Sequence, residues 1–95
     1  MHAVVTRVTV DGSREAEARS VLQDVVVPQA MALPGFEGGH WLRALDDSTE
    51  GTGMLFFDTE ANARAAADQI RSEGPPPQAP VTMEAVTEYE VVVQA

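Results

Sequence analysis

The chain has 95 residues, of which 44% are hydrophobic, with fifteen acidic side chains, six basic side chains and no cysteine. The formal charge of −9 argues against nucleic-acid binding, because phosphate contacts need cations, and the lack of cysteine excludes disulfides and thiolate metal sites. No apolar run approaches the roughly 20 residues of a membrane-spanning helix, and no basic region precedes an apolar stretch at the start, so we expect a soluble, cytoplasmic protein.

Residues 2–10 are predicted to form a strand, because β-branched residues alternate there between two faces. One face holds Val4, Val8 and Val10, and the other holds Ala3, Val5, Arg7 and Thr9.

A helix is expected to begin near Ser13, which can cap it. One face carries apolar residues at i, i+3, i+4 and i+7, which predicts that it covers a sheet. Pro28 lacks an amide hydrogen, so the helix should kink or end near Val27 and resume through Met31. The apolar stripe comprises Ala18, Val21, Leu22 and Val25.

The middle of the chain reads as a hairpin. Residues 36–45 form one strand, in which Gly38 and Gly39 indicate a bulge or the close approach of another group. Residues 46–51 form the loop. Residues 53–57 are apolar at every position, which is typical of a central strand.

A second helix is expected from a cap at Asp58 or Thr59 to Gly74, with a stripe of small residues. A proline-rich connector, residues 75–80, leads to a long final strand, residues 81–95. The stripe comprises Ala63, Ala66, Ala67 and Ile70.

This β-α-β-β-α-β order predicts a single α+β domain, residues 1–95, with a ferredoxin-like fold. Its four-stranded antiparallel sheet has the order 4-1-3-2, and both helices lie on one face. Pairing the first and last strands places Met83, Ala85 and Tyr89 beneath the helices. The other face retains too much apolar surface to face water, which predicts that a second copy covers it.

Three segments of the chain resemble the dimeric α+β barrel superfamily, and most closely its antibiotic biosynthesis monooxygenase-like branch. These are residues 34–43 (PGFEGGHWLR), 54–63 (MLFFDTEANA) and 89–91 (YEV). The resemblance implies a homodimer with a central barrel and a ligand cleft between sheet and helices in each subunit. Characterised members include cofactor-free oxygenases of anthrone-like or quinol-like aromatics and haem-degrading enzymes.

His40 and Trp41 are the first candidate site residues, because an imidazole can accept a proton near neutral pH and an indole can stack on an aromatic substrate. Neighbouring strand residues point to opposite faces, so only one of the two can line the cleft, and a bulge at the glycines could change which one. The alternative is a packing tryptophan and a histidine at the sheet edge.

Thr6 and Tyr89 are predicted to orient a ligand from the helix-facing side, over Ala63 and Ala66, with Met83 as an apolar wall. The alternative is that Tyr89 reaches a rim and Thr6 only packs. No metal site is expected, because the two histidines lie two strands apart.

No cofactor is expected either. Haem-degrading relatives use an asparagine on the first strand together with a tryptophan and a histidine around the cleft, whereas this chain has Thr6 and Arg7 in that stretch and no histidine in its second helix. Two hypotheses remain. The chain binds a small aromatic or quinone-like molecule and oxidises it without cofactor, with His40 as proton acceptor. Alternatively, it is a non-catalytic module that binds a small molecule or dimerises.

Overall fold

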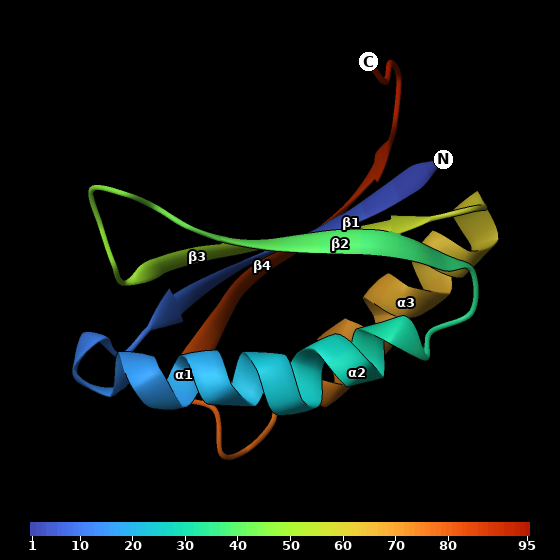
Figure 1. The fold of residues 1–95 in the computed structure, drawn as a ribbon. Helices are drawn as coiled ribbons and strands as arrows, with labels where there is room; N and C mark the ends of the chain where they lie inside the picture. Colours follow the sequence, from blue (N-terminus) through green and yellow to red (C-terminus); the bar gives the residue numbers. More distant parts are fainter.

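A computed structural model describes residues 1–95 as one antiparallel four-stranded sheet with all helices on one face (Figure 1). The strand order β2-β3-β1-β4 is the predicted order read from the opposite edge, which confirms the ferredoxin-like α+β fold. No helix is both long and apolar enough to cross a membrane. The elements in chain order are β1 (His2–Val10), the 3-10 turn η1 (Gly12–Arg14), α1 (Glu15–Val21), the π-turn η2 (Leu22–Val26), α2 (Val27–Met31), β2 (Phe36–Arg43), β3 (Glu50–Phe57), α3 (Glu60–Glu73) and β4 (Val81–Glu90).

The first helical segment continues through Pro28 instead of ending before it. A π-turn precedes α2, in which the amide of Val27 donates to the carbonyl of Leu22. Such a turn lets a helix continue past a position with a missing hydrogen-bond donor. The result is one helical run, α1–α2, along the sheet (Figure 1).

Helix α3 supplies most of the helical contribution to the core. Thr59 caps it, its hydroxyl accepting a hydrogen bond from the amide of Asn62, as predicted. The helix ends at Gly74, whose φ of 67° favours glycine. Three alanines of α3 are buried, which lets the helix contact β1, β3 and β4 closely. The core comprises Val4, Ala30, Leu55, Phe57, Ala63, Ala66 and Ala67.

Strand β4 contains a bulge that the sequence did not reveal. Arg7 of β1 pairs with Ala85, but the next residue, Val8, pairs with Met83, so Glu84 is an extra residue. An inserted residue exchanges the two faces of a strand beyond it. Tyr89 therefore pairs with Ala3 on the face away from the helices, and the prediction that it lies beneath them is wrong.

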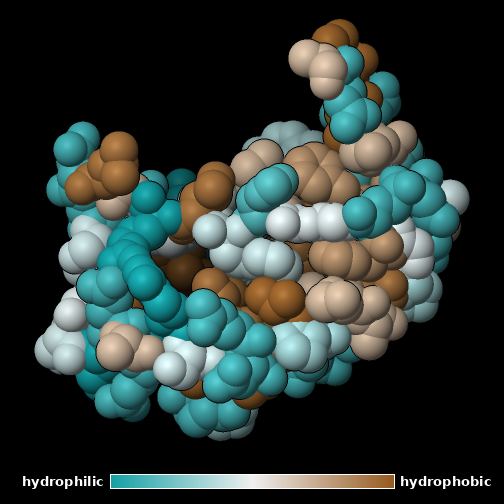
Figure 2. All heavy atoms as spheres, in the orientation of Figure 1, coloured by the Kyte–Doolittle hydropathy of each residue, from teal (hydrophilic) through white to brown (hydrophobic).

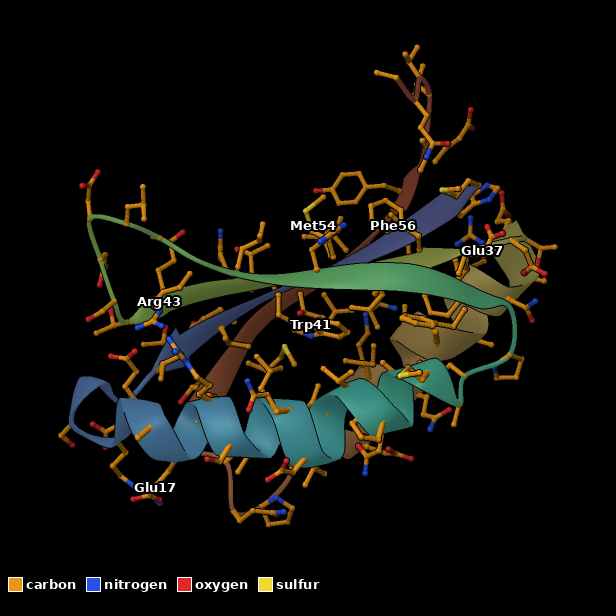
Figure 3. The ribbon with its side chains drawn as sticks, in the orientation of Figure 1. Glu17, Glu37, Trp41, Arg43, Met54 and Phe56 are labelled. Carbon is orange, nitrogen blue, oxygen red and sulfur yellow. The ribbon has the colours of Figure 1, made fainter.

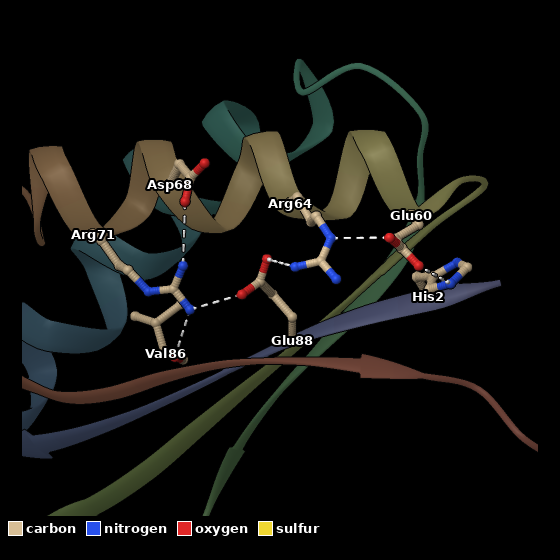
Figure 4. Close-up of polar contacts among 7 residues, drawn as sticks. All are labelled: His2, Glu60, Arg64, Asp68, Arg71, Val86 and Glu88. Atoms are coloured by element: carbon tan, nitrogen blue, oxygen red, sulfur yellow. Dashed lines mark hydrogen bonds and ion pairs between the residues drawn. The ribbon is translucent and has the colours of Figure 1, made fainter.

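The same bulge places Glu88 beneath α3, where it joins a row of charged side chains (Figure 4). Arg71 Nη2 donates to Glu88 Oε2 at 3.0 Å, and Arg64 Nη1 lies 3.8 Å from Glu88 Oε1. Arg64 also donates to Glu60, whose other oxygen lies 3.8 Å from Nε2 of His2. These polar contacts connect α3 to β4 and to the start of β1.

The face of the sheet away from the helices, the outer face, carries large apolar side chains. In Figure 3 the labelled Met54 and Phe56 point away from the helices on this side. Tyr89 lies on the same face and is half exposed. The final strand ends at Glu90, earlier than predicted, and Val92 and Val93 follow it as exposed residues.

Candidate functional site

A cleft of about 930 Å³ lies between the helical run α1–α2 and the sheet. Its floor is formed by all four strands, its roof by the helical run, and one end by the last turn of α3 with the proline connector. In Figure 2 it is visible as a hollow with an apolar interior. This volume lies within the range of about 300 to 1,000 Å³ found for small-molecule pockets.

Trp41, and not His40, faces this cleft. Trp41 pairs with Gly53 on the helix-facing side of β3, whereas His40 pairs with Met54 on the outer face. Figure 3 shows the indole of Trp41 pointing from β2 toward the helices. The placement of His40 as a proton acceptor in the cleft is therefore wrong, because the sheet separates its side chain from any molecule bound there.

Two glycines make room for the indole of Trp41. A β-carbon on Gly53 would lie 3.2 Å from both Cδ1 and Nε1 of the indole, and one on Gly39 would lie 3.1 Å from its far edge, Cη2. The ring therefore extends over both glycines, where any larger residue would displace it. Gly39 therefore shows the predicted close approach of another group, whereas Gly38 lies at a shift of the register with β3, the other outcome that the glycines of β2 indicated.

Thr6 and Met83 line the cleft together with Trp41. The Thr6 hydroxyl also lies against Gly53, at 2.6 Å from the position of a β-carbon there. The hydroxyl and the indole N–H thus approach the same point of the floor. The predicted location of the pocket is wrong, however, because Ala63 and Ala66 are buried against the sheet and the space lies under the other helical segment.

The sequence did not predict the charged side chains at the mouth of the cleft. Arg43, at the end of β2, forms an ion pair with Glu15 in the first turn of α1. Arg19 Nη2 lies 3.5 Å from the same carboxylate oxygen, and all three residues line the cleft. The available signal was spacing, since Arg43 follows Trp41 by two residues and so shares its face of the strand.

The groups with shifted pKa values lie outside the cleft. A hydrogen bond and the charge of Arg64 lower the pKa of Glu60, and hydrogen bonds from the hydroxyl and amide of Thr49 lower the pKa of Asp47. Near the start of α1, hydrogen bonds from the hydroxyl and amide of Ser13 lower the pKa of Asp11. The hydrogen bond between Arg14 and Glu17 lowers the pKa of Glu17 and raises the pKa of Arg14. These shifts reflect surface hydrogen bonds.

Several solved structures share the fold over nearly the whole chain. The haem degrader MhuD from Mycobacterium tuberculosis superposes with a TM-score of 0.77 at 17% identity, covering 100% of this chain and 99% of that chain. SnoaB, a cofactor-independent oxygenase from Streptomyces nogalater, gives 0.71 at 20% identity, with 98% and 94% covered. An antibiotic biosynthesis monooxygenase-like protein from Bordetella bronchiseptica gives 0.69 at 18% identity, with 97% of each chain covered.

No protein-family model and no curated protein matches the sequence. The chain shares the fold of these structures, as the sequence resemblance indicated. At these identities the likeness concerns the fold alone.

The residues of the cleft do not fit haem. Haem iron in proteins is held by histidine, cysteine, tyrosine or methionine side chains, and the cleft is lined by no histidine, cysteine or tyrosine. His40 is on the outer face, and His2 lies beside α3. Met83 alone offers a thioether. No three acidic or histidine side chains gather to hold a metal ion elsewhere in the chain.

Proposed function

We propose that this protein binds a small planar aromatic molecule, of the quinol or anthrone kind, in the cleft of each subunit. The observation that carries the proposal is the indole of Trp41, laid over two glycines and lining an apolar space of about 930 Å³. An aromatic ring stacked on this indole would lie beside the Thr6 hydroxyl and the indole N–H. These two groups can orient a ring hydroxyl or carbonyl of the ligand.

Oxygenation of the bound molecule is the second candidate function, favoured by the fold shared with SnoaB, a cofactor-independent oxygenase. In such a reaction the deprotonated aromatic itself supplies the electrons that reduce dioxygen, so the protein needs to bind and desolvate it. The chain places no imidazole in the cleft. The proton acceptor would then be water or one of the two carboxylates that line the cleft, those of Glu15 and Glu73.

Ligand titration tests the binding proposal. Trp41 is the single tryptophan of the chain, so its fluorescence reports on the cleft directly. Binding of 1,4-dihydroxynaphthalene under anaerobic conditions should change the tryptophan fluorescence of the wild type. Measured by calorimetry in both proteins, this binding should weaken about tenfold in Trp41→Ala, from loss of a stacking interaction. His40→Ala is the matched control, because His40 is the adjacent residue on the opposite face. Equal losses in both variants would contradict the proposal.

Oxygen consumption separates binding from oxygenation. With an anthrone or a hydroquinone that binds, an oxygenase should consume dioxygen above the spontaneous rate, and Trp41→Ala should remove that excess while His40→Ala retains it. If every bound reducing aromatic leaves the rate unchanged, the protein is a binding module of the same fold.

The outer face supports a homodimer as part of this proposal. Phe56 and Met54 lie there with Val5 and the half-exposed Tyr89, and a second copy would remove them from water. Light scattering should give twice the 10.2 kDa of one chain. Phe56→Glu should convert this species to a monomer, whereas Leu45→Glu, in the exposed hairpin loop, should not. A wild-type monomer at micromolar concentration would refute the homodimer.

A further inference from the structure

The mouth of the cleft concentrates positive charge in a strongly acidic protein. Arg19 and Arg43, two of only six basic residues, both line it and share a single carboxylate, that of Glu15. Along α3 the balance is reversed, since Arg64 and Arg71 contact three carboxylates, those of Glu60, Asp68 and Glu88. The cluster at the mouth therefore has one more positive than negative charge.

Most hydrogen-bond donors of this pair of arginines are unused. A guanidinium has five N–H groups, and Arg43 uses only Nη1, toward Glu15, while Arg19 uses only Nη2. Both side chains also remain partly exposed to solvent, at 34% and 59%. The mouth can thus accept a second carboxylate in the bidentate manner that arginine favours.

The distance between Arg43 and Trp41 determines how far from the aromatic ring a ligand must carry its carboxylate. The two residues are separated by one position on β2, so their side chains rise from the same face about 7 Å apart along the strand. A ring stacked on Trp41 with a carboxylate projecting toward the hairpin would reach the guanidinium.

Resting on the proposed function, we infer that the ligand is an aromatic carboxylate, and that Arg43, assisted by Arg19, is the residue that recognises its acid group. Glu15 already accepts from one N–H group of Arg43 and neutralises part of the positive charge at the mouth. Glu15 therefore competes with the ligand for Arg43.

A purely structural ion pair would give a different result. If Arg43 and Glu15 only tie the hairpin to α1, then removing either partner breaks the same contact and has the same effect on binding. If Arg43 recognises an anion, the two removals act in opposite directions, because Arg43→Gln deletes the recognition group and Glu15→Gln deletes its competitor.

Calorimetric titration with a matched ligand pair, anthraquinone-2-carboxylate and the neutral anthraquinone-2-carboxamide, tests this inference. The wild type should bind the acid about tenfold more tightly than the amide, from a charge-assisted hydrogen bond. Arg43→Gln should abolish that preference and leave amide binding unchanged, and Glu15→Gln should tighten acid binding several-fold. Arg14→Gln is the control, because Arg14 is a neighbouring arginine, paired with Glu17, that does not line the cleft.

Each other outcome overturns the inference in a distinguishable way. Equal losses in Arg43→Gln and Glu15→Gln would show a structural tie only. Equal binding of acid and amide, unchanged in Arg43→Gln, would refute carboxylate recognition but leave aromatic binding intact. If neither probe binds, the inference and the proposed function both fail. Should Arg43→Gln not fold, as judged by circular dichroism, the sign of the Glu15→Gln effect decides.

Discussion

Two helical segments cover the same face of the sheet, but only α3 is packed against it along its length, and the run α1–α2 contributes to the core only Ala30, near its end. In α3 the side chains of Ala63, Ala66 and Ala67 are buried, at 2%, 2% and 0% exposure, whereas neither α1 nor η2 contains a buried residue. Both segments carry the same i, i+3, i+4, i+7 pattern. Periodicity therefore identifies the face that a helix turns toward the sheet, but the size of the side chains and the tertiary contacts determine how closely it approaches.

The largest difference between the two helical segments is expected when one side chain in each is enlarged and the free energy of unfolding is compared. Ala67→Leu inserts three carbons at a fully buried position and should lower the free energy of unfolding by about 1–3 kcal/mol, from overpacking. Ala18→Leu, in the roof of the cleft, should change it by less than about 0.5 kcal/mol, because the added atoms enter open space. Urea denaturation compares the two. Equal losses would mean that α1 is packed as tightly as α3.

A smaller decrease in the free energy of unfolding is expected from a substitution at the floor of the cleft. Gly53→Ala places a β-carbon 2.6 Å from the Thr6 hydroxyl and 3.2 Å from the indole of Trp41, and should cost about 1–2 kcal/mol while shifting tryptophan emission. Adding Thr6→Ala removes the closest contact and should recover part of the loss. Gly12→Ala, whose β-carbon would be 3.6 Å from its nearest neighbour, Thr49, is the control.

The smallest effect concerns the ion pairs that connect α3 to β4. Glu88→Gln removes the carboxylate that Arg64 and Arg71 share and should lower the free energy of unfolding by about 0.5–1 kcal/mol at low salt. In 1 M NaCl the difference should shrink, because salt screens partly exposed charges. Glu84→Gln, at the bulge and bonded only to the Thr9 hydroxyl, should change stability less. Equal effects at both salt concentrations would contradict an electrostatic origin.

Much of the fold could be predicted because it depends on local signals. Alternation of residues on two faces predicted the first strand, and the uninterrupted apolar run predicted the central position of β3. The bounds of α3 were predicted from Thr59 and Gly74. A break near Pro28 was predicted, but the π-turn that lets the helix continue to Met31 was not, because either structure can accommodate a proline.

The candidate site was harder to predict, because it depends on register. Trp41, Thr6 and Met83 lie together in the cleft, whereas His40 and Tyr89 lie on the outer face. A strand repeats every two residues, so one inserted residue reverses every later side chain. Glu84 is such an insertion, and nothing in the sequence around it indicates that it lacks a partner residue on β1.

The sequence by itself determined the order of the elements, the strand order and which stripe of each helix faces the sheet, because these follow from periodicity, caps and turns within short segments. Only the tertiary structure decided which side chains meet. The bulge in β4, the position of Gly53 under Trp41 and the approach of Arg43 to Glu15 all involve residues of different elements. Their positions depend on the register in which neighbouring strands pair and on how the helices pack on them, and local patterns do not specify either.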